Sequence, residues 1–330
     1  MVSESPFSRR EALTALTATT LTTAFASTHS ATSHAEAALQ RSQLPGFYRF
    51  RVGEIEVTVL SDGVFTVPTR FSAENIPEDQ LRGYLSALYY KPDNQVRHMN
   101  FALINTSKEV VLIDPGAGPD FRSTAGKLLS NLKASGYSPE QIDKVFITHA
   151  HPDHIWGLID FFEGTPTFPN ATYVLHEDEW AFWTADDAKT RLPKSLESFA
   201  VGAVRHLKPI AGRQTLFSKE AEIANGVFAV PTIGHTIGHS SVVVRSKGEQ
   251  LLITGDAFYH PYITFEHPDW QPLLDMLPEK AVETRKSLTQ MAFADRQLVL
   301  AFHFAFPGLG RVAKRNGSHH WVPANWEWDT

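Results

Sequence analysis

The chain has 330 residues, and a composition of 42% hydrophobic and 20% charged residues is typical of a folded protein with a sizeable core. The net charge of −6 and the lack of a basic stripe argue against binding to DNA or RNA, which needs clustered Lys and Arg. Cys is absent, which excludes disulfides, thiolate nucleophiles and sulfur-ligated metals. A metal ion could therefore be held only by His, Asp or Glu.

Residues 1–37 have the pattern of a twin-arginine export signal. Arg9 and Arg10 precede an apolar stretch rich in Ala and Thr over 12–26, and small residues near Ala35 and Ala37 offer cleavage sites. An amphipathic first helix with two chance arginines is the alternative. This stretch is too short and too rich in Thr to span a membrane, and no later segment meets the requirement for a span. We expect a periplasmic or secreted protein whose mature domain covers 38–330.

Short apolar runs bounded by Gly, Pro, Asn and Asp predict strands along the rest of the chain, and a few longer periodic stretches predict helices. The predicted strands cover 47–52, 55–60, 101–104, 110–113, 145–148, 173–175, 227–230, 241–244, 251–254 and 298–301. The predicted helices cover 124–135, 177–185 and 280–294. Ser61-Asp62-Gly63 is expected to end the second strand. Strands and helices alternate without a break in composition, so we predict one α/β domain.

The strongest chemical signal is a run of four potential metal ligands directly after the strand predicted over 145–148. His149, His151, Asp153 and His154 lie within six residues of one another. In a loop, His149 and His151 can both turn toward one ion, while Asp153 and His154 reach a second ion beside it. A solvated polar loop is the alternative, but four such side chains after an apolar strand favour a metal site.

Three more ligand candidates follow apolar strands in the same way. His235 lies in a Gly-rich loop, Asp256 offers a carboxylate that can bridge two cations, and His303 lies between two Phe residues. Each of them alone could be a structural residue of the core. Together with the first run they predict a centre that holds two metals.

The order His-x-His-x-Asp-His, His, Asp, His resembles the two-metal hydrolases of the metallo-β-lactamase superfamily, from about Gly46 to the end of the chain. Within it, the chain is most similar to the methyl parathion hydrolase and lactonase group, through 61–63, 168–171 and 306–310. The resemblance implies an αββα sandwich, in which two mixed sheets pack face to face with helices outside. It also implies two divalent ions per chain, with zinc as the first expectation and manganese, cobalt or iron as alternatives.

The resemblance further assigns a role to each ligand. His149, His151 and His235 would hold one ion, the second ion would lie on Asp153, His154 and His303, and Asp256 would bridge them. Two such ions lower the pKa of a shared water, so that a bridging hydroxide can act as the nucleophile.

Two further residues are expected to support the ligands rather than bind metal. Asp114 would orient the ligand loop. His239 is expected to have a structural role, because the family uses the first His of this loop, which is His235.

Two features bear on the small-molecule substrate. Phe121, Trp183 and Phe199 stand where methyl parathion hydrolase lines its pocket with aromatic residues, which favours phosphotriesters or aryl esters. Tyr259, three residues after Asp256, resembles a Tyr of the acyl-homoserine lactonases that donates a hydrogen bond to the carbonyl oxygen.

We expect a lactonase or carboxylic-ester hydrolase, with phosphotriester hydrolysis as the alternative. The absence of Cys, and Ile155 at a position where another β-lactamase class has His, disfavour β-lactam substrates. Two less favoured hypotheses are an iron-dependent persulfide dioxygenase of the same fold and a metal-binding module without catalysis. The resemblance allows for a homodimer, although the sequence shows no dimer surface.

Overall fold

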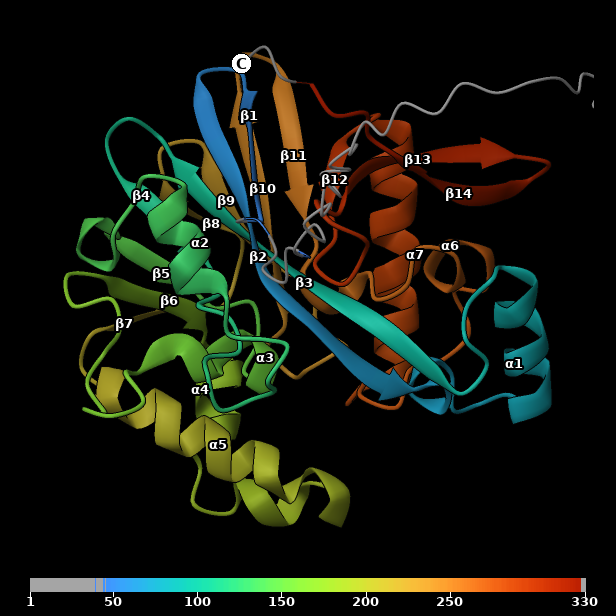
Figure 1. Ribbon diagram of the computed structural model, residues 1–330, viewed down its shortest axis with the longest axis horizontal. Coiled ribbons are helices and arrows are strands. Elements are labelled where there is room, and N and C mark those ends of the chain that lie inside the picture. The colour runs from blue at the N-terminus through green and yellow to red at the C-terminus, as the bar shows by residue number, and fades with distance from the viewer. Residues whose placement is uncertain (1–38, 40–43, 45, 328–330) are drawn as a thin grey trace, which may run out of the picture. The chain divides into compact units, whose positions relative to one another are not determined.

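The computed structural model describes residues 39, 44 and 46–327, and the predicted export signal lies outside them. From residue 46 on, the strands form two sheets of seven strands each (Figure 1). The first sheet, in spatial order, consists of β1 (Phe47–Val52), β2 (Ile55–Pro68), β3 (Asn94–Asn105), β4 (Val110–Ile113), β5 (Lys144–Phe146), β6 (Thr172–His176) and β7 (Gln214–Phe217). The second sheet, also in spatial order, consists of β14 (Ser318–Pro323), β13 (Leu309–Arg315), β12 (Leu298–Leu300), β11 (Glu249–Ile253), β10 (Ser240–Ser246), β9 (Val227–Pro231) and β8 (Ala221–Ala224).

Both sheets are mixed. In the first, β1 to β4 pair antiparallel and β4 to β7 pair parallel. In the second, only β11 and β12 pair parallel. Val57 and Leu103 of the first sheet lie in the same buried cluster as Val242 and Leu251 of the second, so the main core lies between the sheets.

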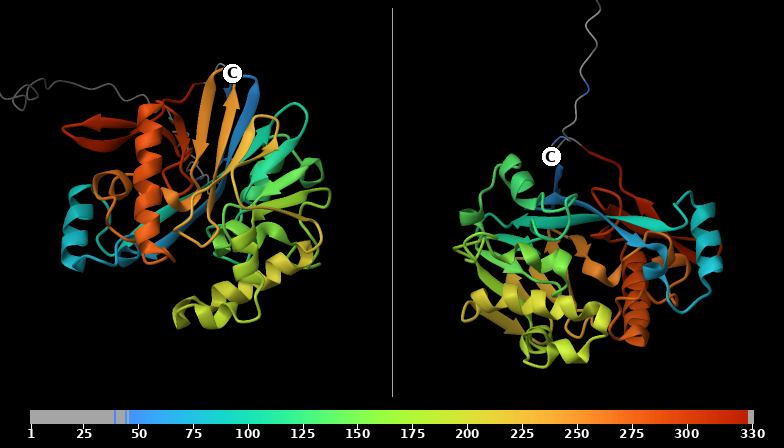
Figure 2. Two further views of the ribbon diagram at one scale, coloured as in Figure 1. Left: turned by 180° about the vertical axis from the view of Figure 1, so that it is seen from behind. Right: turned by 60° about the horizontal axis from the view of Figure 1, so that its bottom comes forward.

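The helices cover the outer faces of the sheets, as Figures 1 and 2 show from several sides. The α-helices are α1 (Glu78–Ala87), α2 (Leu128–Ala134), α3 (Pro152–Ile155), α4 (Glu177–Thr184), α5 (Glu197–Leu207), α6 (Ile263–Glu266) and α7 (Pro278–Ala294). Short 3-10 helices are η1 (Thr69–Ser72), η2 (Pro139–Gln141), η3 (Trp156–Leu158), η4 (Ala188–Arg191), η5 (Lys194–Leu196), η6 (Lys208–Ile210) and η7 (Gly255–Ala257). Helix α2 packs on β2, α4 packs on β6 and β7, and α7 packs on β13. The predicted αββα sandwich is therefore confirmed. Among the described residues, no helix is both long and apolar enough to cross a membrane.

The prediction that Ser61-Asp62-Gly63 ends the second strand is wrong. Strand β2 continues to Pro68 beside β3, with a shift in register between Ser61 and Gly63. Gly63 has a φ of +99°, and a Cβ atom there would lie 2.2 Å from the carbonyl oxygen of Thr124. The turn-forming residues therefore produce a β-bulge instead of a stop, because β3 offers a pairing partner on both sides of it.

The bulge has a structural purpose, since it turns the buried Asp62 side chain toward two neighbouring segments. Its carboxylate accepts the backbone N–H of Ala117 at 2.7 Å and that of Leu128 at 2.6 Å. The second bond lies at the first residue of α2, which starts later than predicted because Gly126 has a φ of +70°.

Several elements were missed because their sequences are short or polar. Strands β7, β8, β13 and β14 carry many exposed positions, and no long apolar run marks them. Helices α1 and α5 were also not predicted. Strand β3 extends well beyond the predicted 101–104, and its polar first half carries residues that reach the functional site.

Candidate metal centre

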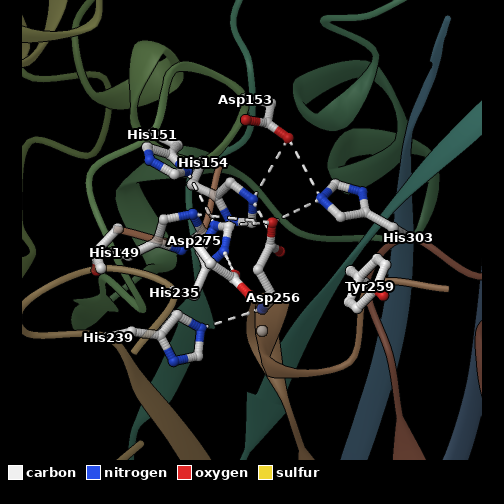
Figure 3. Close-up of polar contacts among 12 residues, drawn as sticks. His149, His151, Asp153, His154, His235, His239, Asp256, Tyr259, Asp275 and His303 are labelled. Atoms are coloured by element: carbon white, nitrogen blue, oxygen red, sulfur yellow. Dashed lines mark hydrogen bonds and ion pairs between the residues drawn. The ribbon is translucent and has the colours of Figure 1, made fainter. Parts of the chain in front are cut away.

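The predicted ligands come together at one edge of the sandwich, where strands of both sheets end. His149 and His151 follow β5, and His235 lies in the loop between β9 and β10. Asp256 lies in η7 after β11, and His303 follows β12. Figure 3 shows Asp256 in the middle, with His149, His151 and His235 on one side and Asp153 and His303 on the other.

The geometry divides these side chains into overlapping groups that could each hold an ion. Within each group one potential ligand atom per residue lies within 4.8 Å of the others. The groups are His149 with His151 and His235, His149 with His154 and Asp256, and Asp153 with His154 and His303. Two of the groups are the ligand sets expected from the sequence, apart from the bridging residue.

Asp256 lies between the two sets. Its Oδ2 atom is 3.0 Å from Nε2 of His303 and 3.4 Å from Nε2 of His235. Its Oδ1 atom is 3.2 Å from Nε2 of His154. One carboxylate thus faces ligands of both sets, as a bridging residue must.

The protonation states of His149, His151 and Asp256 suit divalent metals. Burial, together with neighbouring imidazoles, holds the pKa of His149 and of His151 well below the ordinary value, so both rings are neutral. Burial alone would raise the pKa of Asp256, but His303 and His154 bring it well below its ordinary value. Neutral imidazole and ionised carboxylate are the forms that bind metal. Burial alone would lower the pKa of His154 and of His303, but neighbouring carboxylates, Asp256 above all, raise it, so a metal would have to displace a proton from each of these two rings.

Unpaired buried atoms also fit a metal site. Among the described residues, Nε2 of His149, Nε2 of His154 and Oδ1 of Asp256 are buried and form no hydrogen bond, although the last two atoms lie 3.2 Å apart. Such atoms are costly without a partner. Their N and O chemistry matches the ligands of zinc and similar divalent ions, so these residues fit a two-metal centre.

Asp114, which was expected to orient the ligand loop, contacts two parts of it. Its Oδ2 atom accepts hydrogen bonds from Nδ1 of His154 at 2.8 Å and from the Thr148 hydroxyl at 2.6 Å. The Thr148 oxygen in turn lies 3.0 Å from Nδ1 of His149. Asp114 has a φ of 60°, unusual for a residue other than Gly. This network places the proton of both imidazoles on Nδ1 and leaves Nε2 for a metal.

Asp275 was not predicted from the sequence. It accepts a hydrogen bond from His235 and so orients that ring, as Asp114 orients His154. Its Oδ1 atom accepts the N–H of His235 Nδ1 at 2.9 Å, and its Oδ2 atom accepts an N–H of Arg285 at 2.8 Å. Asp275 lies in an irregular segment between α6 and α7, where no motif marks it. His303 is oriented differently, by donating from Nδ1 to the carbonyl oxygen of His98 at 2.8 Å.

Glu179 is the second residue that was missed, and it ties two ligand loops together. Its fully buried carboxylate accepts the backbone N–H of Ala150 and the indole N–H of Trp183 on Oε1, at 2.8 and 2.7 Å. On Oε2 it accepts the hydroxyl of Thr236 and the backbone N–H of Gly238, at 2.7 and 2.8 Å. The only hint in the sequence is an acidic residue four positions before Trp183 in a predicted helix.

His239 uses both ring nitrogens within the protein. Nε2 accepts the backbone N–H of Asp256 at 3.1 Å, and Nδ1 lies 2.9 Å from the Thr232 hydroxyl. A Cβ atom on Gly255 would lie 2.7 Å from Nε2 of His239, so glycine is needed for this approach. His239 therefore has no lone pair free for a metal, and it positions the backbone at Asp256.

A cavity of about 150 Å³ opens beside the ligand cluster. Among the aromatic residues expected in a substrate pocket, Phe121 and Phe199 line it. The wall and floor are completed by Phe65, Val67, Phe71, Arg97, Arg122, His151, Asp153, His235, Asp256, Tyr259, Pro272, Leu274 and His303.

Trp183 does not line this cavity, which corrects the expectation for that residue. It is 1% exposed, donates to Glu179, and packs its ring edge-on to His151 with 5.9 Å between the ring centres. The helical period of α4 turns Trp183 toward Glu179, one turn earlier, and away from the cavity.

Tyr259 lines the cavity and lies beside His303 in Figure 3. Its hydroxyl donates to the carbonyl oxygen of Trp270 at 3.2 Å, which is long for an O–H···O bond. Burial raises the pKa of the phenol above its ordinary value of 10.0. Tyr259 is therefore a neutral donor, with a weak partner, at the edge of the ligand cluster.

Comparison with known proteins gives the same family. The pattern of the metallo-beta-lactamase superfamily matches residues 96–303. The N-acyl homoserine lactonase AiiB of Agrobacterium fabrum (strain C58) is 28% identical over 182 residues, which cover 48% of this chain and 62% of the lactonase. The chain thus spans about three fifths of the length of such relatives.

Two solved structures are similar over their full length. AbOPH, described as a hydrolase in the beta lactamase superfamily, is 33% identical with a TM-score of 0.79, and the match covers 87% of this chain and 100% of AbOPH. AidC, described as a dizinc quorum-quenching lactonase, is 25% identical with a TM-score of 0.81 and the same coverage. With its sandwich fold, its cluster of His and Asp and the match over 96–303, the chain belongs to the metallo-β-lactamase superfamily.

Proposed function

We propose that the chain hydrolyses lactones or carboxylic esters with two divalent metal ions, zinc in the first instance. The observation that carries this proposal is the position of Asp256, which faces both ligand sets at the floor of a largely apolar cavity. The similarity to the dizinc lactonase AidC over its full length supports it.

In this proposal the seven ligands act as the sequence implied. His149, His151 and His235 would hold one ion, Asp153, His154 and His303 would hold the other, and Asp256 would be shared between them. When bound, two such ions would supply an activated water and a Lewis acid for the scissile carbonyl oxygen.

The protein itself contributes orientation and a hydrogen-bond donor. Asp114 and Asp275 hold three of the imidazoles in the tautomer that presents Nε2, directly or through Thr148. Tyr259 would donate its hydroxyl proton to the carbonyl oxygen of the substrate. This requires the hydroxyl hydrogen to turn away from Trp270, to which it makes only a long bond.

Phosphotriester hydrolysis is the second candidate, and the aromatic wall supports it. Phe121 and Phe199 line the cavity and suit an aryl leaving group. We expect this activity to be weaker, because in this proposal the hydroxyl of Tyr259 assists at a carbonyl oxygen. An iron-dependent dioxygenase would use one ion and leave half of the ligands idle, and oxygen uptake with one iron per chain would be its signature.

A small panel of substrates tests the proposal. Zinc-reconstituted protein would be assayed with a long-chain acyl-homoserine lactone, dihydrocoumarin, an aryl acetate and methyl paraoxon. We expect turnover of the lactones and the ester, dependent on about two zinc ions per chain, and loss of turnover in Asp256→Asn. Absence of turnover on the whole panel in protein that carries its metals would overturn the proposal.

A further inference from the structure

Arg97 is a buried cation in the wall of the active-site cavity. It lies in the polar first half of β3, is 7% exposed, and lines the cavity together with Tyr259 and Asp256. Nothing in the metal chemistry described above requires a positive charge at this position.

The partners of Arg97 in the protein are neutral. It donates from Nη1 to the carbonyl oxygen of Tyr259 at 2.9 Å and from Nη2 to the hydroxyl of Ser72 at 2.6 Å. Within residues 46–327, its guanidinium group makes no other hydrogen bond and touches no carboxylate directly, although the charge of the nearby Asp256 acts in its favour. A guanidinium group has five N–H donors, so several remain for a ligand. Burial lowers the pKa of Arg97, which reflects the cost of keeping this charge away from water.

Arg285 is a second buried arginine, and its charge is paired directly with a carboxylate. Arg285 is 1% exposed, and its Nη2 atom lies 2.8 Å from the carboxylate of Asp275. A buried charge without a partner of opposite sign costs several kcal/mol in typical proteins. Unlike Arg285, Arg97 has no carboxylate in direct contact with its guanidinium group, and it borders a cavity.

Apart from the proposed metal ligands, the charged side chains that line the cavity are all positive. In the part of the chain that the structure describes, the carboxylates that line the cavity are those of Asp153 and Asp256, and both belong to the proposed ligand sets. Outside the proposed ligands, the remaining charges are Arg97 and the exposed Arg122, and all the other lining side chains except Tyr259 are apolar. A ligand that fits this wall combines an apolar arm with a negative charge.

We propose that Arg97 is an anion-binding residue of the substrate site, and that the preferred substrates are esters or lactones whose apolar arm carries a carboxylate. This inference rests on the proposed hydrolase function and specifies its substrate class. Arg97 binds and orients the carboxylate with charge-assisted hydrogen bonds, and it takes no part in bond breaking.

Paired substrates that differ only in charge test this specificity. The mono-4-nitrophenyl esters of adipate and suberate are compared with their methyl esters, which have nearly the same length but no charge. The zinc enzyme is expected to favour the acids about tenfold to a hundredfold in kcat/KM, as for hydrogen bonds to a charged group. Arg97→Gln should abolish this preference, mainly through a higher KM for the acids.

Three variants separate charge from structure. Arg97→Lys should keep part of the preference, because it keeps the charge. Ser72→Ala removes one hydrogen bond of Arg97 and should keep the preference. Arg122→Gln removes an exposed charge of the same cavity and should have a small effect, since exposed charges are screened. An equal loss on acids and neutral esters in Arg97→Gln would overturn the inference, because it would show a structural role.

Binding without turnover gives an independent measurement. Calorimetric titration of the zinc protein with 1-hexanesulfonate, a weak metal ligand, and with neutral 1-hexanol should show tighter binding of the anion in the native chain and equal binding in Arg97→Gln. Preferential anion binding that depends on Arg97, without hydrolysis of any ester, would refute the proposed function but support the anion site. Hydrolysis of both ester types, with equal anion binding in the native chain and in Arg97→Gln, would refute the anion site but not the proposed function.

Discussion

Asp275 accepts a hydrogen bond from Nδ1 of His235 at 2.9 Å, and the same carboxylate pairs with the buried Arg285 at 2.8 Å. Asp275 and His235 lie 40 positions apart in the chain. The carboxylate holds the imidazole with Nε2 toward His151, whose Nδ1 atom is 3.0 Å away. A ligand of the proposed centre is thus positioned by a segment that contributes no ligand.

We expect Asp275→Asn to weaken metal binding about tenfold to a hundredfold, the usual effect of losing a residue that orients a ligand. Competition for zinc with a chromophoric chelator measures this. Asp269→Asn is the matched control, because Asp269 is an exposed residue that pairs with Lys286 on the surface. Unchanged zinc affinity in a folded Asp275→Asn protein would contradict the role assigned here.

Glu179 is expected to contribute strongly to stability, because it accepts four hydrogen bonds that join two ligand loops. In Glu179→Gln the amide group would face two donors, and a buried donor without an acceptor costs about 1–3 kcal/mol. We predict a loss of roughly 2–4 kcal/mol in the free energy of unfolding by urea. Glu177→Gln, at an exposed position of the same helix turn, should change it by less than about 0.5 kcal/mol. A similar change in the free energy of unfolding for both variants would argue against the role of Glu179 in joining the two ligand loops.

Asp62 should make stability depend on pH. Burial raises the pKa of its carboxyl from 3.8 to about 7, although the backbone N–H groups of Ala117 and Leu128 act against the shift. A raised pKa in the folded state means that the stabilising effect is complete below pH 3.8 and is lost as the pH rises through 7.

The test compares the native chain with Asp62→Asn, which cannot titrate at this position. Between about pH 4 and 8, the free energy of unfolding of the native chain should fall relative to the variant by up to roughly 4 kcal/mol. Urea unfolding at several pH values gives this difference, and groups common to both proteins cancel. A difference that rises with pH would show that the carboxylate is held ionised by its hydrogen bonds.

Tyr259→Phe should slow lactones about tenfold to a hundredfold and phosphotriesters less, if its hydroxyl assists at a carbonyl oxygen. The variant keeps the ring over which Arg285 lies at 4.8 Å, so the packing is preserved. Steady-state rates on an acyl-homoserine lactone and on methyl paraoxon measure the contrast. An equal loss on both substrates would count against the proposed role.

Residues 1–37 remain a proposed export signal. We expect the combined change of Arg9→Lys and Arg10→Lys to retain the protein in the cytoplasm, because the twin-arginine route depends on both side chains. Cell fractionation with immunoblotting detects this. Recovery of the double variant in the periplasm in the same amount as the native chain would refute a twin-arginine signal.

The local patterns of the sequence were sufficient for the fold class and for the group of ligand candidates. Strands such as 47–52 and 110–113 were predicted with the observed bounds, because apolar runs between turn residues need no distant information. The polar strands β13 and β14 were missed, since their pairing with one another and with β12 defines them more than their composition does. Ser61-Asp62-Gly63 was misjudged for a related reason, because only a paired neighbour turns a stop into a bulge.

The sequence by itself determined the residues that can bind metal. His and Asp residues directly after apolar strands form a dense pattern that can be recognised without knowing the fold, and burying such polar side chains without a ligand would be unfavourable. The sequence also indicated two supporting residues, Asp114 and His239, but only the tertiary structure revealed the others and which side chains line the cavity. Asp275, Glu179 and Arg97 acquire their roles from partners far away in the chain. Trp183 was predicted to line the pocket, but in the folded protein it points toward Glu179 and donates a hydrogen bond to it. The physical reason is that the effect of a buried charge or hydrogen bond depends on its neighbours, and folding brings those neighbours together.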